Sequence, residues 1–347
     1  MINSRFIIDG VAQELTPAQM LRSLGAQGVS EAPGGEDVLD ESLDPNPETC
    51  ALCESQIPEY REAVLGAFPG IFPVLYPASY AVGEVCSAII GSLCSGAELP
   101  LEELRLVLSL SSPAPSNAPV GTMSAFYRAL EAACAYMDGL DVRLACCSVE
   151  PSSGLGFSAS CAGTVSGAED AALGDDPVAG VVPGADACEE DWIVYVPFET
   201  AEYRLGGSLL CEALGISQGP APVLEDTDYF MDCYEVVREM IQDGVALAAC
   251  PVGRGGLVRA LEAMCPSARI SLADVLRANP RAGMVQVLFS EVPGILLRVR
   301  DSDFDYIDAE FLLQDVLFYP LGHPSASGGL RFESGSALSA LLGGLVR

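Results

Sequence analysis

The sequence contains no lysine, one histidine (His323) and one tryptophan (Trp192) among its 347 residues. Without lysine, the chain cannot form a Schiff base with a carbonyl substrate or hold nucleotide phosphates with a Walker-type lysine. A single histidine excludes a multi-histidine metal site, and it excludes a histidine-based catalytic triad everywhere except around His323. Arginine, carboxylate and thiol groups therefore remain to carry any chemistry.

Positive charge is also scarce. All 17 basic residues are arginine, against 48 acidic residues, so the formal net charge is −31 and the isoelectric point is about 4.1. No window of the chain is basic, which excludes a duplex nucleic acid as partner, because such binders need a basic stripe to neutralise phosphates. Half of the residues are hydrophobic, so the chain can still bury a core, and its length favours two domains.

Cysteine, in contrast, is plentiful, with 13 residues scattered along the chain. The N-terminus has no apolar stretch long enough for a secretory signal, and the apolar run 68–82 contains three prolines and is short for a membrane span. We therefore expect a cytoplasmic protein without a membrane partner, with reduced and mostly buried cysteines. Cys50 and Cys53 form a lone C-x-x-C pair, which is either an ordinary loop or part of a structural zinc site.

Two acidic stretches divide the chain. The first, residues 26–49, follows a predicted helix that Thr16 caps, Pro17 opens and Gly25 ends. It has seven acidic and no basic side chains, which is typical of a linker. The second, residues 166–190, is rich in Gly, Ala and Asp and predicts a domain boundary.

Helical and strand patterns alternate along the rest of the chain, which indicates an α+β or mixed α/β fold. Helices are expected near 58–66, 80–94, 124–137, 228–243, 256–265, 272–279 (capped by Ser271) and 303–314, and a further helix is expected to open at Gly206-Gly207-Ser208. Strands are expected at 6–8, 104–110, 142–148, 156–165, 192–196, 245–249, 285–289, 295–300, 316–319 and 330–333.

Five landmarks follow one another in a fixed order. They are Ala81-Val82-Gly83-Glu84, Leu205-Gly206-Gly207-Ser208, Gly255-Gly256-Leu257 before a helix to Cys265, Leu288-Phe289-Ser290-Glu291 before Gly294, and Leu321-Gly322-His323. This order resembles the second half of the large, single-chain phosphoribosylformylglycinamidine synthases. That family has two tandem units similar to aminoimidazole-ribonucleotide synthetase, each with an A and a B domain, and residues 6–24 resemble the segment that bridges them.

The resemblance implies a bridging segment and acidic linker at 1–57, a synthetase-like A domain at 58–190 and a B domain at 191–347. In the family the A domains of the two units pair through their sheets. We therefore expect an exposed apolar sheet face within about 70–166. Through this face the chain would bind a first-half unit or form a homodimer.

The family activates an amide oxygen with ATP and magnesium, and ammonia from a glutaminase domain then displaces the phosphate. Its Gly-Glu-x-x-x-Asn motif keeps Glu84 here, but Ala88 replaces the Asn. Its His-Asp-x-Ser-Asp-Gly-Gly-Leu loop corresponds to residues 250–257, where Arg254 replaces the second Asp. Its Pro-Val-Gly-Lys-Asp-Ser loop corresponds to residues 145–150 and loses both the Lys and the Asp. We therefore expect binding of magnesium with ATP or ADP to be weak or lost.

We assign no catalytic residue, but several residues are candidates for binding. Gly206, Gly207 and Ser208 either cradle an anion at a helix start or let the chain turn into that helix. Glu84 is either a retained magnesium ligand or a polar residue on a helix face.

The second group of candidates surrounds the helix start near residue 256. Arg254, Gly255 and Gly256 either bind phosphate or another anion, or Arg254 pairs with one of the 48 acids. Glu291 is expected to be a solvated turn acid, and His323 an exposed side chain.

The leading hypothesis is a phosphoribosylformylglycinamidine synthase-like half in purine biosynthesis that acts mainly as structure. It resembles an ATP-dependent C–N ligase but would be inactive alone, and it would need a first-half synthetase unit and a glutaminase domain as partners. The alternative is a pseudoenzyme or protein-interaction module that keeps the fold without nucleotide chemistry. Neighbouring genes for the missing first half and glutaminase would favour the first hypothesis.

Overall fold

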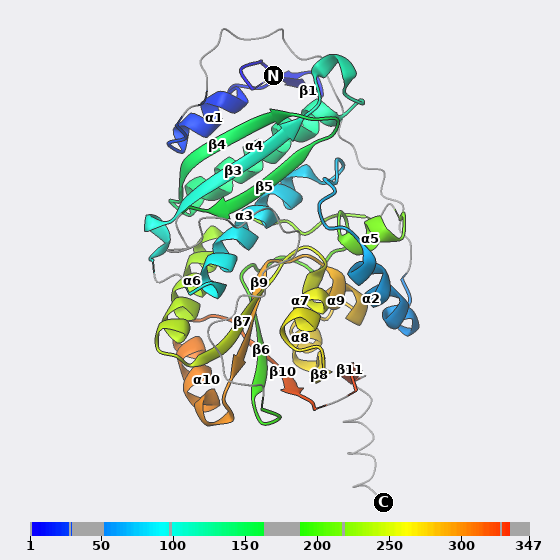
Figure 1. The fold of residues 1–347 in the computed structure, drawn as a ribbon, viewed down its shortest axis with the longest axis vertical. Helices are drawn as coiled ribbons and strands as arrows, with labels where there is room; N and C mark the ends of the chain where they lie inside the picture. Colours follow the sequence, from blue (N-terminus) through cyan, green and yellow to red (C-terminus); the bar gives the residue numbers. More distant parts are fainter. Residues whose placement is uncertain are drawn as a thin grey trace, which may run out of the picture.

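The computed structural model describes residues 2–27, 29, 52–96, 99–162, 188–216, 219–326 and 328–333. Its two main sheets have three and six strands, and they lie at opposite ends of the molecule with helices between them (Figure 1). Most of the two acidic stretches, and Cys50 of the C-x-x-C pair, lie outside the described residues.

The N-terminal segment forms the predicted capped helix, α1 (Pro17–Ser23), which packs on α4. The Thr16 hydroxyl accepts a hydrogen bond from the Gln19 N–H at 3.3 Å, and the Gln19 side chain accepts one from the Thr16 N–H at 2.7 Å. Gly25 follows with φ of +85°, the left-handed conformation that ends many helices. A hairpin of β1 (Ile7–Ile8) and β2 (Val11–Ala12) precedes α1.

The three-stranded sheet has the order β4-β3-β5, with β3 parallel to β4 and antiparallel to β5. Two long helices pack against each other beside this sheet, and α3 also contacts β7 of the larger sheet. Figure 1 shows α3 between the two sheets. The elements are α3 (Pro77–Cys94), β3 (Arg105–Ser112), α4 (Thr122–Gly139), β4 (Arg143–Pro151) and β5 (Gly156–Cys161).

The outer face of this sheet differs from the expected apolar face. Ser109 is paired with Ser148 on one side and Ser158 on the other, and all three side chains are exposed. The alternate residues Leu108 and Leu110 are buried in the core. Because side chains alternate across a strand, the leucines face the helices and the serines face outward, so the outer face is polar at these positions.

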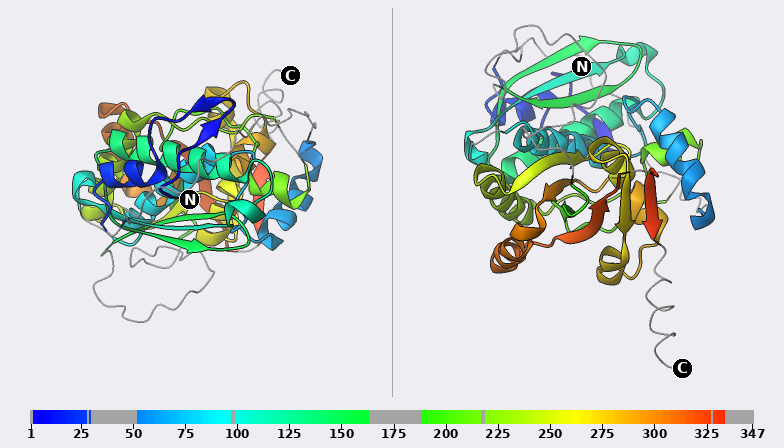
Figure 2. Two further views of the ribbon diagram at one scale, coloured as in Figure 1. Left: turned by 90° about the horizontal axis from the view of Figure 1, so that it is seen from above. Right: turned by 60° about the horizontal axis from the view of Figure 1, so that its bottom comes forward.

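The six-stranded sheet has the order β11-β8-β10-β6-β9-β7, in which only the β11–β8 pair is parallel. Figure 2 shows β11 at the edge of this sheet. Its strands are β6 (Trp192–Pro197), β7 (Ala246–Val252), β8 (Ala268–Ser271), β9 (Gly294–Val299), β10 (Tyr319–Pro324) and β11 (Leu330–Glu333).

Helices cover both faces of the six-stranded sheet (Figure 1). Val194 and Val196 of β6 face the core shared with α3, α6 and α10, whereas Ile193 and Tyr195 face a second core under α2, α7 and α9. All four side chains are buried, as expected for a strand covered on both faces. The helices are α2 (Ile57–Gly66), α5 (Leu209–Ala213), α6 (Thr227–Gln242), α7 (Gly256–Met264), α8 (Ala273–Ala278), α9 (Met284–Phe289) and α10 (Phe304–Leu313).

The strand predicted at 285–289 is wrong, because these residues form helix α9. The Gln286 side chain accepts a hydrogen bond from the Gly283 N–H at 3.1 Å, which is half of a capping box. Strand β9, next in the chain, already has β6 and β7 on its two edges and offers no further pairing position.

Several other predicted boundaries also move. Helix α3 begins at Pro77 rather than Tyr80, with Pro77 in the first turn, where its missing N–H costs nothing. The residue before helix α8 is Leu272, so Ser271 is not its cap, although the Ser271 hydroxyl accepts the Ala273 N–H at 3.4 Å. Strand β10 begins only at Tyr319, where the strand expected at 316–319 ends.

Helix α3 is, within the described residues, the one helix long and apolar enough to cross a membrane by length and composition. Its 18 residues have a mean hydropathy of 1.2, and 56% of that window is buried. Because α3 packs against α4, β5 and β7, its apolar composition is accounted for by its place in the core.

The described residues include 12 of the 13 cysteines. None of these twelve is in a disulfide, and seven are buried. Burial raises the pKa of the Cys250 thiol to about 11 and that of Cys134 to about 12, so these thiols stay protonated and unreactive at neutral pH. Cys146 is more exposed than its neighbour Cys147, as expected for adjacent residues on a strand.

Candidate functional site

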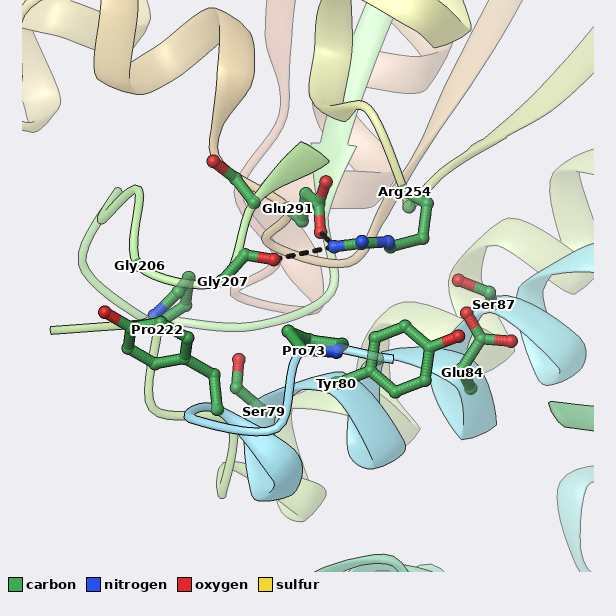
Figure 3. Close-up of a pocket in the computed structure, with 14 residues that line it drawn as sticks. Pro73, Ser79, Tyr80, Glu84, Ser87, Gly206, Gly207, Pro222, Arg254 and Glu291 are labelled. Atoms are coloured by element: carbon green, nitrogen blue, oxygen red, sulfur yellow. Dashed lines mark hydrogen bonds and ion pairs between the residues drawn. The ribbon is translucent and has the colours of Figure 1, made fainter. Parts of the chain in front are cut away.

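The candidate site is a small cavity where the start of α3 meets the loops that lead into α5 and α7 (Figure 3). Its volume is about 30 Å³, room for about two water molecules. The residues around it come from distant parts of the chain. They are Pro73, Tyr76, Ser79, Tyr80, Gly83, Glu84, Ser87, Gly206, Gly207, Ser208, Pro222, Gly253, Arg254 and Glu291.

Two glycines position Arg254 between β7 and α7. Gly255 and Gly256 have φ of +90° and +68°, in the left-handed region that other residues rarely adopt. A Cβ atom on Gly256 would lie 2.7 Å from the backbone oxygens of both Leu288 and Ser290. Glycine is therefore required here for two reasons, the backbone conformation and the close approach of the end of α9.

We expect Gly256→Ala to destabilise the protein by at least about 2 kcal/mol, because left-handed strain of about 1 kcal/mol is joined by a backbone clash. Gly244→Ala is a matched control, since Gly244 has the same φ of +68° but a Cβ atom there would have no neighbour within 4 Å. Urea unfolding of both variants measures the difference. Equal losses would show that the close approach at Gly256 is unimportant.

Arg254 is the centre of the site. Its Nη1 donates to Glu291 Oε2 at 2.6 Å and to the Gly207 carbonyl at 2.7 Å, and its Nη2 donates to Glu212 Oε2 at 2.8 Å. Only 11% of the Arg254 side chain is exposed. Figure 3 shows Arg254 reaching over the cavity toward Gly207 and Glu291. The guanidinium thus pairs with two carboxylates and a carbonyl in a nearly dry setting.

The same guanidinium also contacts the segment that leads into α3. Its carbon lies 5.2 Å from the centre of the Tyr80 ring, within the range of a cation–π interaction. Longer hydrogen bonds run from Arg254 to the carbonyls of Pro69, at 3.5 Å, and Ile71, at 3.4 Å. Arg254 therefore ties the loops beside α5 and α7 to the segment before α3.

Glu291 binds the starts of two helices, whereas the sequence predicted that it would be a solvated acid in a turn. Its Oε1 accepts a hydrogen bond from the N–H of Leu209, the first residue of α5, at 2.7 Å. It accepts another from the N–H of Gly255, the residue directly before α7, at 2.9 Å. Its side chain is 14% exposed, and it follows helix α9 rather than a strand. Backbone N–H groups at helix starts commonly bind anions, and here a carboxylate of the chain itself is that anion.

Burial changes the pKa of two acids of the site, Glu84 and Glu212. Burial between α3 and the Arg254 loop raises the pKa of Glu84 to about 7, although the positive charge of Arg254 acts in the opposite direction. Burial likewise raises the pKa of Glu212, with the same opposition from Arg254. Figure 3 shows Glu84 one turn beyond Tyr80 on α3, on the same side of that helix.

The structure brings most of the candidate residues together. Gly206, Gly207, Ser208, Arg254 and Glu84 line one cavity. Arg254 forms ion pairs with Glu212 and Glu291, which is the second of the two roles that the sequence left open for it. Within the described residues, no group of three or more His, Cys, Asp or Glu side chains could hold a metal ion.

Sequence reasoning missed two side chains that contact Arg254, namely Glu212 and Tyr80. Glu212 follows Ser208 by four residues, in the first turn of α5, and no local pattern distinguishes it from other surface acids. Tyr80 lies one helical turn before Glu84, which is a spacing that could have suggested a shared face.

His323 lies outside this cavity and is not exposed as expected. Its Nδ1 is 3.0 Å from the Asp191 carbonyl oxygen, and its ring centre is 4.0 Å from that of Trp192. His323 is therefore a residue of strand β10 that packs against Trp192, and its contacts hold the fold together.

Comparisons with known proteins point to the same family. No family model matches the chain. The phosphoribosylformylglycinamidine synthase of Homo sapiens is 26% identical over 137 residues, and a probable chloroplastic/mitochondrial phosphoribosylformylglycinamidine synthase of Arabidopsis thaliana is 24% identical over 135 residues. Each match covers 39% of this chain and 10% of the relative, so the matched part spans about a tenth of these proteins.

Solved structures extend the similarity to most of the chain. Thermotoga maritima PurL complexed with FGAR matches with a TM-score of 0.55 and 13% identity, over 80% of this chain and 42% of that chain. The PurLQS structure from Thermotoga maritima matches with a TM-score of 0.53 and 15% identity, over 76% and 40%. At such identities the likeness shows the fold, the α+β fold of the aminoimidazole-ribonucleotide-synthetase kind expected from the sequence. In sequence and in fold, the chain therefore resembles one half of a phosphoribosylformylglycinamidine synthase.

Proposed function

We propose that this chain is the structural half of a phosphoribosylformylglycinamidine synthase-type assembly, and that its own nucleotide site is closed. The observation that carries the proposal is the mutual pairing of Arg254 and Glu291. Glu291 takes up the backbone N–H groups that would hold a phosphate, and Arg254 stands where the family has an acid.

The residues present do not fit a magnesium-bound nucleotide. Magnesium prefers carboxylate and phosphate oxygens and gives up its water reluctantly, so it needs free acidic ligands. Here one oxygen each of Glu212 and Glu291 is bound by Arg254, whose charge would also repel the ion. The cavity beside Arg254, at about 30 Å³, is too small to enclose a nucleotide, and the net charge of −31 disfavours a polyanion.

Partners are needed for activity under this proposal. A first-half synthetase unit would bind the substrate and ATP, and a glutaminase domain would supply ammonia, in the cytoplasm. This chain would add the second pair of A and B domains and no reacting group. The reaction served would be the ATP-dependent amidation of formylglycinamide ribonucleotide in purine biosynthesis.

Isothermal titration calorimetry with ADP and ATP in excess magnesium tests the closed site. We expect no binding tighter than about 1 mM, and no turnover of formylglycinamide ribonucleotide with ATP and ammonium by the chain alone. A low-micromolar dissociation constant that Glu84→Ala weakens about tenfold, or 1.4 kcal/mol, would overturn the proposal. Absence of amidation after adding the first-half unit and glutaminase would instead favour a stand-alone interaction module.

A further inference from the structure

A second and larger hollow lies beside the closed cavity. It has a volume of about 310 Å³, and its walls are the segment before α3 and the helix α5 with the turn that follows it. Most of the lining is apolar, and among the described lining residues Glu212 alone carries a charge. We call this hollow the α5 groove; it is lined by Pro73, Val74, Leu75, Tyr76, Gly207, Ser208, Cys211, Glu212, Gly215 and Ile216.

Large apolar side chains are exposed around the α5 groove. Leu75, in its wall, is 44% exposed, and Leu214, between two lining residues, is 36% exposed. Ile71 and Phe68, in the loop that contacts Arg254, are 55% and 59% exposed. Single exposed apolar residues are ordinary, but several around one apolar hollow mark an interaction surface. A small ligand inside the groove would leave Ile71 and Phe68 uncovered, so the surface fits a polypeptide better.

The chain segments that form the walls of the groove are acidic. Segments 52–76 and 199–225, which contribute its walls, hold seven acidic and two basic residues. Both basic residues are in ion pairs, Arg61 with Glu262 and Arg204 with Glu202. Arg254, behind the groove, is shared between two carboxylates. The two segments that form the walls therefore carry more negative than positive charge, in a chain whose net charge is −31.

We propose that the α5 groove docks a segment of a different polypeptide, one whose apolar side chains are flanked by lysine or arginine. The apolar side chains would fill the hollow and cover its rim, and the basic ones would meet the acids around it. A second copy of this chain fits poorly, because each copy has a net charge of −31 and no lysine. This surface is separate from the outer face of the three-stranded sheet. It adjoins the small cavity and shares Gly207 and Ser208 with the wall of that cavity.

Fluorescence anisotropy with three labelled peptides tests the proposal on the full chain near physiological salt. One peptide combines leucine and lysine, one combines leucine and glutamate, and one combines serine and lysine. We expect the leucine–lysine peptide to bind at least about tenfold more tightly than either of the others, because only it satisfies both the groove and its charge.

Matched variants locate the binding. Leu75→Ser, in the groove, should weaken binding of the leucine–lysine peptide about tenfold. Leu312→Ser should leave it unchanged, since Leu312 is 78% exposed on α10, on the opposite side of the six-stranded sheet (Figure 1). Because both residues are exposed, both variants should keep the wild-type unfolding midpoint.

Three results would overturn this inference. Equal binding of the serine–lysine peptide would show attraction by net charge alone. Binding that Leu75→Ser and Leu312→Ser affect equally would place the contact elsewhere. A dimer in light scattering that Leu75→Ser abolishes would make a second copy of the chain the occupant.

Discussion

Replacing Arg254 with methionine is expected to lower the free energy of unfolding by about 3 kcal/mol, the lower end of the range for breaking a buried ion pair. The arginine side chain is 11% exposed, and its partners Glu291 and Glu212 are 14% and 24% exposed. Methionine has a similar length but no charge, so both carboxylates would lose their counter-charge while still partly removed from water. Urea unfolding at neutral pH measures the loss.

Arg204→Met is the matched control for this experiment. Arg204 also pairs with a carboxylate, that of Glu202, but the two side chains are 36% and 52% exposed. Exposed pairs contribute about 0–1 kcal/mol, so this variant should unfold close to the wild type. Adding Glu291→Gln to Arg254→Met should recover part of the loss, since one buried charge then disappears. If Arg254→Met costs no more than Arg204→Met, the centre of the site is not an essential ion-pair network.

Glu84 is expected to make the protein less stable as pH rises from about 4.5 to 7. Below this window the carboxyl is protonated in the folded and the unfolded chain, and its contribution is fully present. As pH rises, the unfolded chain releases the proton first, near 4.5, whereas burial holds the folded pKa at about 7. The difference corresponds to about 3 kcal/mol, lost by the upper end of the window.

Glu84→Gln should remove most of this slope, because glutamine does not titrate. The variant should be about as stable as the wild type near pH 4.5 and more stable at pH 8, in urea unfolding series at several pH values. Burial raises the pKa of Glu199 as well, so a slope of the same sign should persist in the variant. Glu102→Gln, at an exposed glutamate, is the control for the loss of one negative charge. Parallel curves for Glu84→Gln and the wild type would contradict this assignment.

The parts of the fold predicted best are those with local signals. Thr16 and Pro17 start α1 as expected, because a hydroxyl cap and a first-turn proline act within four residues. The helix expected to open at Gly206-Gly207-Ser208 is α5, and the structure adds that Ser208 caps it through a hydrogen bond from the Cys211 N–H at 3.4 Å. The fold class also followed from the sequence, since alternating helical and strand periods do not depend on distant contacts.

The errors arose where neighbours in space override local pattern. Residues 285–289 form an apolar run that suits a buried helix or a buried strand equally well. The helix is favoured by two contacts that are distant in sequence. Strand β9 is already paired with β6 and β7, and α9 packs on α7. The outer sheet face was misjudged because the expected apolar surface came from the family resemblance, whereas Ser109, Ser148 and Ser158 share that face here.

The sequence by itself determined that positive charge is scarce, that two glycines let the chain turn after Arg254, and that this arginine could meet either an anion or an acid. The tertiary structure alone decided between them. Glu212 and Glu291 are 42 and 37 residues from Arg254 along the chain, and an ion pair depends on separation in space. With 48 acids available, only the packing of α5, α7 and the end of α9 selects these two. The same packing gives the Leu209 and Gly255 N–H groups to Glu291 rather than to a bound phosphate.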